Sequence, residues 1–153
     1  MADESDVVYT AGTSTRTLEE FLDLLAAYGI ELVVDARRFP TSRRYPQFTQ
    51  PSLAAAARDR GMRYLWMGES LGGYRHGGYE AHMTTRLFQG GLDQIEPLLR
   101  QQRGAIICSE RLPWRCHRRF IARALEARGW RAVHIIERDR TWTPREEPRR
   151  EES

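Results

Sequence analysis

Short apolar runs rich in β-branched residues recur along the chain and alternate with longer segments of helical periodicity. Each run has the length of a strand and is bounded by glycine, proline or polar residues, which predicts five strands. The predicted strands are Val7–Ala11, Glu31–Ala36, Met62–Met67, Gly104–Ser109 and Ala132–Glu137. The fourth run is apolar without alternation, as is typical of a strand covered on both faces.

The segments between these runs carry apolar residues at helical spacing. Thr17 precedes the first of them and Glu20 occupies the capping-box position, so we expect a helix to begin at this point. The predicted helices are Thr17–Gly29, Pro51–Gly61, Tyr79–Gln102, with a break near Gly90-Gly91, and Pro113–Gly129. Strands that alternate with helices form βαβ units with right-handed crossovers. We therefore predict a single-domain, three-layer α/β/α fold with a five-stranded, mostly parallel Rossmann-like sheet.

The length of 153 residues fits one domain, which we place at residues 1–137. Residues 138–153 hold five arginines, five acids and little that is apolar except Trp142, so we predict a charged, disordered C-terminal tail. No apolar run reaches the length of a membrane span, and the acidic start lacks the features of a signal peptide. We expect a cytoplasmic protein that does not enter a membrane.

The distribution of charge is more informative than the formal net charge of +3. The chain has no lysine, so all 24 basic residues are arginines, and four of them lie within residues 37–44 and four within 111–119. Guanidinium forks match the oxygens of phosphates and carboxylates. A solvated, salt-bridged surface is the alternative reading of either cluster.

The carboxyl ends of the predicted strands converge on one rim, where parallel sheets bind their ligands. The residues that follow the strands supply hydroxyls, arginines and glycines to this rim. Those expected to bind an anion are Ser14, Thr15, Arg16, Asp35, Arg37, Gly72, Gly73, Arg75 and Arg118. The Gly12–Thr15 turn matches neither a dinucleotide fingerprint nor a P-loop, so, taken alone, it is better explained as a capped helix start than as a phosphate cradle. For Asp35 and Arg37, a structural ion pair is equally consistent with the sequence.

The segment Cys108–Arg119 contains the candidate catalytic groups Cys108, Glu110, Cys116 and His117. A cysteine at the end of a buried strand is usually a core residue. In the first turn of a predicted helix, the thiol of Cys116 would gain acidity from the helix dipole and from neighbouring arginines. Glu110 and His117 form a potential acid–base pair near neutral pH.

Three chemistries compete for this segment. It is not a Cys-x5-Arg phosphatase loop, because Trp114 stands where that arginine would be. Zinc or iron could be held by Cys108, Cys116 and His117, but no CxxC pair supports a metal and we predict no cofactor. An arginine-lined polar site in which the cysteines contribute modestly is the preferred interpretation.

We accordingly predict an enzyme, a hydrolase or transferase, that binds a phosphorylated or nucleotide-like anion. The alternative is a non-catalytic nucleic-acid-binding module whose aromatic residues stack on bases. The aromatic residues interleaved with the arginines are Tyr45, Phe48, Tyr74, Tyr79 and Trp114. A weaker alternative is a thiol redox or metal protein that uses Cys108 and Cys116.

Several segments together resemble the domain-of-unknown-function 488 (DUF488) family. They are 12–21, 34–42, 46–48, 71–75, 78–79, 108–110 and 116–118, which cover nearly the whole predicted domain in order. The family usually has a histidine where this chain has Thr13. The resemblance implies a compact α/β fold and adds Ser42 to the candidate site. Tyr79, which lies in one of the matching segments, is a further residue expected to bind the anion. It implies that one site contains Asp35, Arg37, Ser42, Arg75, Cys108, Glu110, Cys116, His117 and Arg118. It implies no particular reaction.

Overall fold

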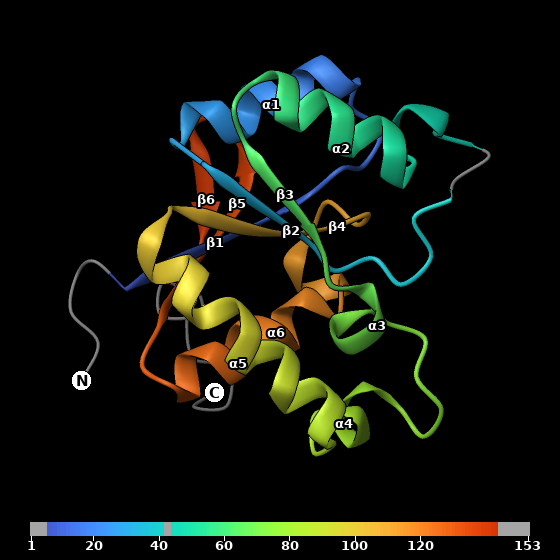
Figure 1. The fold of residues 1–153 in the computed structure, drawn as a ribbon, viewed down its shortest axis with the longest axis vertical. Coiled ribbons are helices and arrows are strands. Elements are labelled where there is room, and N and C mark those ends of the chain that lie inside the picture. Colours follow the sequence, from blue (N-terminus) through green and yellow to red (C-terminus); the bar gives the residue numbers. More distant parts are fainter. Residues whose placement is uncertain (1–5, 42–43, 144–153) are drawn as a thin grey trace, which may run out of the picture.

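A six-stranded sheet forms the centre of the protein in a computed structural model that describes residues 6–41 and 44–143. The strands lie in the order β3-β2-β4-β1-β5-β6, and all are parallel except β6 (Figure 1). Their bounds are β1 Val7–Gly12, β2 Leu32–Asp35, β3 Arg63–Trp66, β4 Gly104–Cys108, β5 Arg131–Glu137 and β6 Arg140–Trp142. The predicted α/β fold with a mostly parallel sheet is confirmed.

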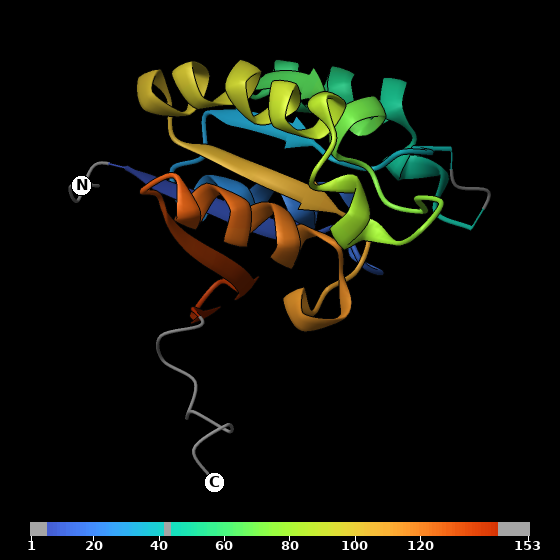
Figure 2. The same cartoon turned by 90° about the horizontal axis from the view of Figure 1, so that it is seen from below.

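Helices cover both faces of the sheet and make the three layers (Figures 1 and 2). On one face lie α1 (Leu18–Ala27) and α2 (Gln50–Asp59), and on the other lie α5 (Arg86–Gln101) and α6 (Arg118–Ala127). The shorter helices are α3 Gly68–Leu71, α4 Tyr79–His82 and the 3-10 turns η1 Pro46–Phe48 and η2 Pro113–Arg115. No helix in the described part of the chain is long and apolar enough to cross a bilayer.

The sheet divides the core in two because successive side chains of a strand point to opposite faces. In β2, Leu32 and Val34 pack with α5 and α6, whereas Val33 packs with α1 and α2. All four residues of β2 are buried, as expected for a strand covered on both sides. The first helix begins as predicted, because Thr17 and Glu20 form a reciprocal capping box.

The sheet has one strand more than the five predicted. After Glu137 the chain reverses, and β6 pairs antiparallel with β5 inside the segment expected to be a disordered tail. Trp142 stabilises this edge because its ring contacts Trp114 at a centroid distance of 5.5 Å and His134 at 5.3 Å. A three-residue strand with one large apolar side chain leaves almost no periodic signal in the sequence. Residues 144–153 of the predicted tail lie outside the described residues.

Two helix predictions are corrected. The break in Tyr79–Gln102 falls at residues 83–85, where the Thr85 hydroxyl accepts a hydrogen bond from the Phe88 amide and α5 begins. The helix then runs unbroken through Gly90 and Gly91. Gly91 permits close packing against α3, since a Cβ atom there would lie 2.5 Å from Ser70 Oγ and 2.8 Å from Ser70 Cβ. The predicted helix Pro113–Gly129 is instead a 3-10 turn followed by α6.

Gly90 and Gly91 offer a matched test of this packing. A Cβ atom at Gly90 would meet nothing within 4 Å, so Gly90→Ala should stabilise the protein by about 1 kcal/mol through helix propensity. Gly91→Ala should destabilise it by about 1–3 kcal/mol, because the methyl group would overpack against Ser70. Denaturant unfolding of both variants measures the difference. Equal stabilisation by both alanines would contradict the close contact between α3 and α5.

Candidate functional site

The loops after β1, β2, β3 and β4 meet at the carboxyl edge of the sheet. At this edge β4 lies between β2 and β1. The helices that follow β1 and β2 cover one face, and the helix that follows β4 covers the other. Such divergence leaves a crevice beside the strand ends. The β1 and β4 loops are tightly joined, because Thr13 N donates to Cys108 O at 2.8 Å and a Cβ atom at Gly12 would lie 1.9 Å from Glu110 O. This contact separates two hollows.

The larger hollow, with a volume of about 610 Å³, is called the cysteine pocket below. It is enclosed by the loops after β2, α3 and β4. Its lining residues are Arg37, Arg38, Phe39, Gly73, Tyr74, Arg75, Gly78, Tyr79, Cys108, Ser109, Glu110, Arg115, Cys116 and His117. The structure thus brings together all four predicted catalytic residues with Arg37, Gly73, Arg75 and Tyr79.

A buried guanidinium lies beneath the cysteine pocket and contacts its sulfur. Arg118, the first residue of α6, is 0% exposed, and its Nη1 lies 2.9 Å from the Sγ of Cys108, which is 2% exposed. The same guanidinium donates to the backbone carbonyls of Glu110 and Arg111. Among the described residues no carboxylate lies within ion-pairing distance of Arg118. Burying a cation is costly without a nearby negative charge, and the thiolate form of Cys108 would supply one.

Thr10 and His134 hold this guanidinium from below. Arg118 Nε donates to Thr10 Oγ1 at 3.0 Å, and Thr10 Oγ1 lies 2.5 Å from His134 Nδ1. Thr10 and His134 are direct partners in the β1–β5 register. Burial, together with the charge of Arg118, lowers the pKa of His134 to about 3, so its ring is neutral at physiological pH and Nδ1 can accept the threonine proton.

The pKa values of the two thiols are shifted in opposite directions. Burial alone would raise the pKa of Cys108, but the hydrogen bond from Cys116 and the charge of Arg118 lower it to about 6. The hydrogen bond to Cys108, together with burial, raises the pKa of Cys116. The sequence indicates the lower pKa for Cys116, but the thiol that contacts the Arg118 guanidinium, and whose pKa is lowered, is that of Cys108. The spacing of residues along the chain cannot show that Arg118 reaches back to the end of β4.

His117 and Glu110 have different partners. His117 Nε2 lies 3.2 Å from Ala36 O, which can only accept, so the neutral ring carries its proton on Nε2 and directs the Nδ1 lone pair toward Cys116 Sγ at 3.7 Å. Burial lowers the pKa of His117, which favours this neutral form. Glu110 accepts from Leu112 N at 3.1 Å and stabilises the turn after β4. The described hydrogen bonds do not join the two as an acid–base pair.

The arginines of the cysteine pocket differ in whether a carboxylate neutralises them. Arg37 forms a two-point ion pair with the fully buried Asp35, at 2.9 and 2.8 Å, and Tyr64 donates to the same carboxylate. Arg75 is fixed by the backbone carbonyls of the α3 segment, including Gly72 O at 2.8 Å. Burial and the nearby charge of Arg38 lower the pKa of Arg75. Neither Arg38 nor Arg75 forms an ion pair with an acid in the described part of the chain.

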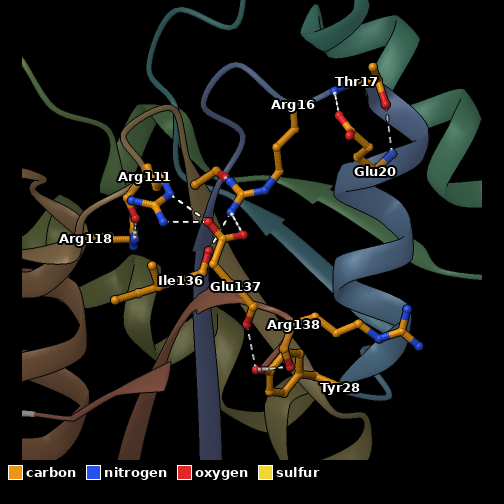
Figure 3. Close-up of polar contacts among 10 residues, drawn as sticks. Arg16, Thr17, Glu20, Tyr28, Arg111, Arg118, Ile136, Glu137 and Arg138 are labelled. Carbon is orange, nitrogen blue, oxygen red and sulfur yellow. Dashed lines mark hydrogen bonds and ion pairs between the residues drawn. The ribbon is translucent and has the colours of Figure 1, made fainter. Parts of the chain in front are cut away.

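The second hollow, of about 440 Å³, holds the predicted residues Ser14, Thr15 and Arg16. Arg16 is occupied there, because it donates to Gly12 O and Ile136 O and pairs with Glu137, which also binds Arg111 (Figure 3). Its charged lining is balanced, with Arg16, Arg111 and Arg138 facing Glu20, Asp23 and Glu137. The residues predicted as one rim are therefore divided between two hollows of different charge.

The remaining predicted residues lie around or below the cysteine pocket. Asp35 and Arg118 are buried beneath it, and Gly72 lies beside it, where a Cβ atom would be 2.5 Å from Arg38 Cβ. Ser42 lies outside the described residues. Thr10 and His134 were not predicted from the sequence as residues that support the site. The one feature that could have indicated them is a polar residue inside an otherwise apolar strand. No three His, Cys, Asp or Glu side chains in the described ranges are grouped as metal ligands, so Cys108, Cys116 and His117 do not form a ligand set.

The fold and this site define a single-sheet α/β protein with a cysteine–arginine pair at the carboxyl edge of its central strands. The chain belongs to the DUF488 family, since the family model described as "Domain of unknown function DUF488" matches residues 17–125. The resemblance found in the sequence is thereby confirmed. No curated protein and no solved structure matches the chain.

The acidity of Cys108 can be measured in the Cys116→Ser variant, which keeps a hydroxyl donor beside the sulfur. We expect its thiolate absorbance and iodoacetamide reactivity to titrate near pH 6. Because an unfolded thiol titrates at roughly 8.5, the thiolate should stabilise the fold fully above that pH, and this contribution should be lost as the pH falls through about 6. Cys108→Ser is the control. A midpoint at the ordinary thiol value would refute the ion pair.

Thr10→Val tests the support beneath Arg118. The substitution keeps the shape of the side chain but leaves Arg118 Nε and His134 Nδ1 without their partner, which should cost about 1–3 kcal/mol of stability. A loosened guanidinium should also raise the midpoint of Cys108 titration, an effect that general destabilisation does not produce. The exposed Thr84→Val should change stability by less than about 0.5 kcal/mol and leave the titration unmoved.

Proposed function

We propose that the cysteine pocket is the active site of an enzyme, a hydrolase or transferase, that acts on a small phosphorylated or nucleotide-like anion. One observation carries the proposal. Cys108, which contacts the buried Arg118, lines a pocket that contains more arginines than carboxylates. A thiol whose pKa is lowered by a specific charged partner, and which lies in a cleft, is a candidate functional group.

The charge of the lining favours an anionic substrate. Four arginines line the pocket, against the single carboxylate of Glu110. Of the four, Arg37 is neutralised by Asp35, whereas Arg38, Arg75 and Arg115 form no ion pair with a described acid. Guanidinium groups without a protein counter-ion attract phosphate or carboxylate oxygens, and the concave surface strengthens that attraction.

The side chains suggest distinct roles in catalysis. The Cys108 thiolate is the nucleophile, held in its charged state by Arg118 and by the hydrogen bond from Cys116. Neutral His117 lines the pocket with its Nδ1 beside Cys116 Sγ, and it is the base that accepts a proton from water or from a substrate hydroxyl. Glu110 acts indirectly by stabilising the turn that carries Cys108 into the site.

Paired alkylating reagents test the proposal without knowledge of the substrate. Iodoacetate is anionic and iodoacetamide is neutral, and both alkylate Cys108 in the Cys116→Ser background. Relative to the same chain in denaturant, the folded protein should favour iodoacetate by about tenfold at low salt, because the arginines attract its carboxylate. Inorganic phosphate should protect Cys108 by competing for the same guanidinium groups.

Charge-neutralising variants locate this preference. Arg38→Gln and Arg115→Gln should each reduce the iodoacetate preference, whereas Arg63→Gln should not, because Arg63 is exposed at the amino end of β3, at the opposite edge of the sheet. A folded protein with no preference for iodoacetate, or a preference insensitive to Arg38 and Arg115, would overturn the proposal.

A further inference from the structure

Two aromatic side chains at the mouth of the cysteine pocket are unusually exposed. Tyr74 is 88% exposed and Phe39 is 63% exposed, and both belong to the pocket lining. Their ring centroids are 6.2 Å apart with an interplanar angle of 37°. Rings this close cannot hold a third ring between them, so a planar ligand would stack on an outer face, and the Tyr74 ring is the more exposed of the two.

The pair is held in place by Arg38. Its Nη1 donates to Tyr74 O at 2.7 Å, and its guanidinium carbon lies 5.3 Å from the centroid of the Phe39 ring. The two loops also pack closely at Gly72, where a Cβ atom would be 2.7 Å from Arg38 Cα. The aromatic surface is therefore positioned before any ligand arrives, and one of the unpaired cations of the pocket adjoins it.

The backbone of Tyr74 is strained. Its φ angle is +60°, a conformation that bulky residues rarely adopt and that costs free energy. Burial of the ring does not offset this cost, because the ring is almost fully exposed. Strain in an exposed aromatic residue beside a pocket is explained if the ring contacts a ligand.

We propose that Tyr74 and Phe39 form a stacking surface for a nucleobase, so that the substrates of the cysteine pocket are nucleoside phosphates rather than sugar phosphates. The inference rests on the proposed function, since the guanidinium groups beyond the stacking surface take the phosphate. A base offers a planar face of the kind that aromatic side chains bind. The pocket volume of about 610 Å³ suits one small ligand, which favours a mononucleotide over a long strand.

The full-length protein is titrated calorimetrically with the four nucleoside 5′-monophosphates, ribose 5-phosphate and a single-stranded oligonucleotide. The tightest nucleotide should bind about tenfold more strongly than ribose 5-phosphate, because stacking adds to the shared phosphate contacts. Tyr74→Asn removes the ring but tolerates positive φ, so it should abolish this difference and leave the affinity for ribose 5-phosphate unchanged. Tyr74→Phe should retain nucleotide binding.

The outcomes separate the two proposals. Equal affinities for nucleotides and ribose 5-phosphate, with no effect of Tyr74→Asn, would overturn the stacking surface and leave the proposed function standing. Tight, salt-sensitive binding of the oligonucleotide without binding of mononucleotides would overturn it in favour of a nucleic-acid partner. Absence of binding by every phosphate, together with no iodoacetate preference, would overturn both.

Discussion

The guanidinium of Arg118 connects more of this structure than any other group at the carboxyl edge. It joins Thr10 of β1, the end of β4 at Cys108, and the turn at Glu110 and Arg111, while its own backbone begins α6. A fully buried cation is costly unless charge and hydrogen bonds compensate it. The same contacts that satisfy the guanidinium therefore fix the floor of the cysteine pocket and lower the pKa of its sulfur, so the stability of this edge and the acidity of Cys108 depend on one interaction.

A comparison with Arg37 shows why Arg118 matters. Arg37 is buried too, but Asp35 gives it a carboxylate and Phe48 O accepts a hydrogen bond from its Nη1. Such a pair is electrically complete and holds the loop after β2 in place. Arg118 has a sulfur where Arg37 has a carboxylate, and a thiolate is a nucleophile as well as a counter-ion. Two buried arginines at one sheet edge thus have different consequences because of the acid that each contacts.

The hydrophobic pattern predicted the layers and the five parallel strands, because burial on both faces leaves long apolar runs such as 104–108. It could not predict β6, whose stability comes from the contacts of Trp142 rather than from its own periodicity. Strand ends also predicted the candidate residues, but not their division between two hollows. That division depends on the contact between Gly12 and Glu110, and on the reach of Arg118 over ten residues of chain to Cys108, neither of which appears in linear spacing.

The floor and the mouth of the cysteine pocket differ in how they are built. The floor is buried, and each of its charges is tied to backbone or strand residues, so a change there alters folding and acidity together. The mouth is exposed, and Tyr74 is joined to Arg38 through a backbone carbonyl, independent of its ring. The ring can therefore change without disturbing the thiolate below. Under the proposed function, the sulfur and its arginine would determine what reaction is possible, while the exposed rings and arginines would determine which anion reaches them.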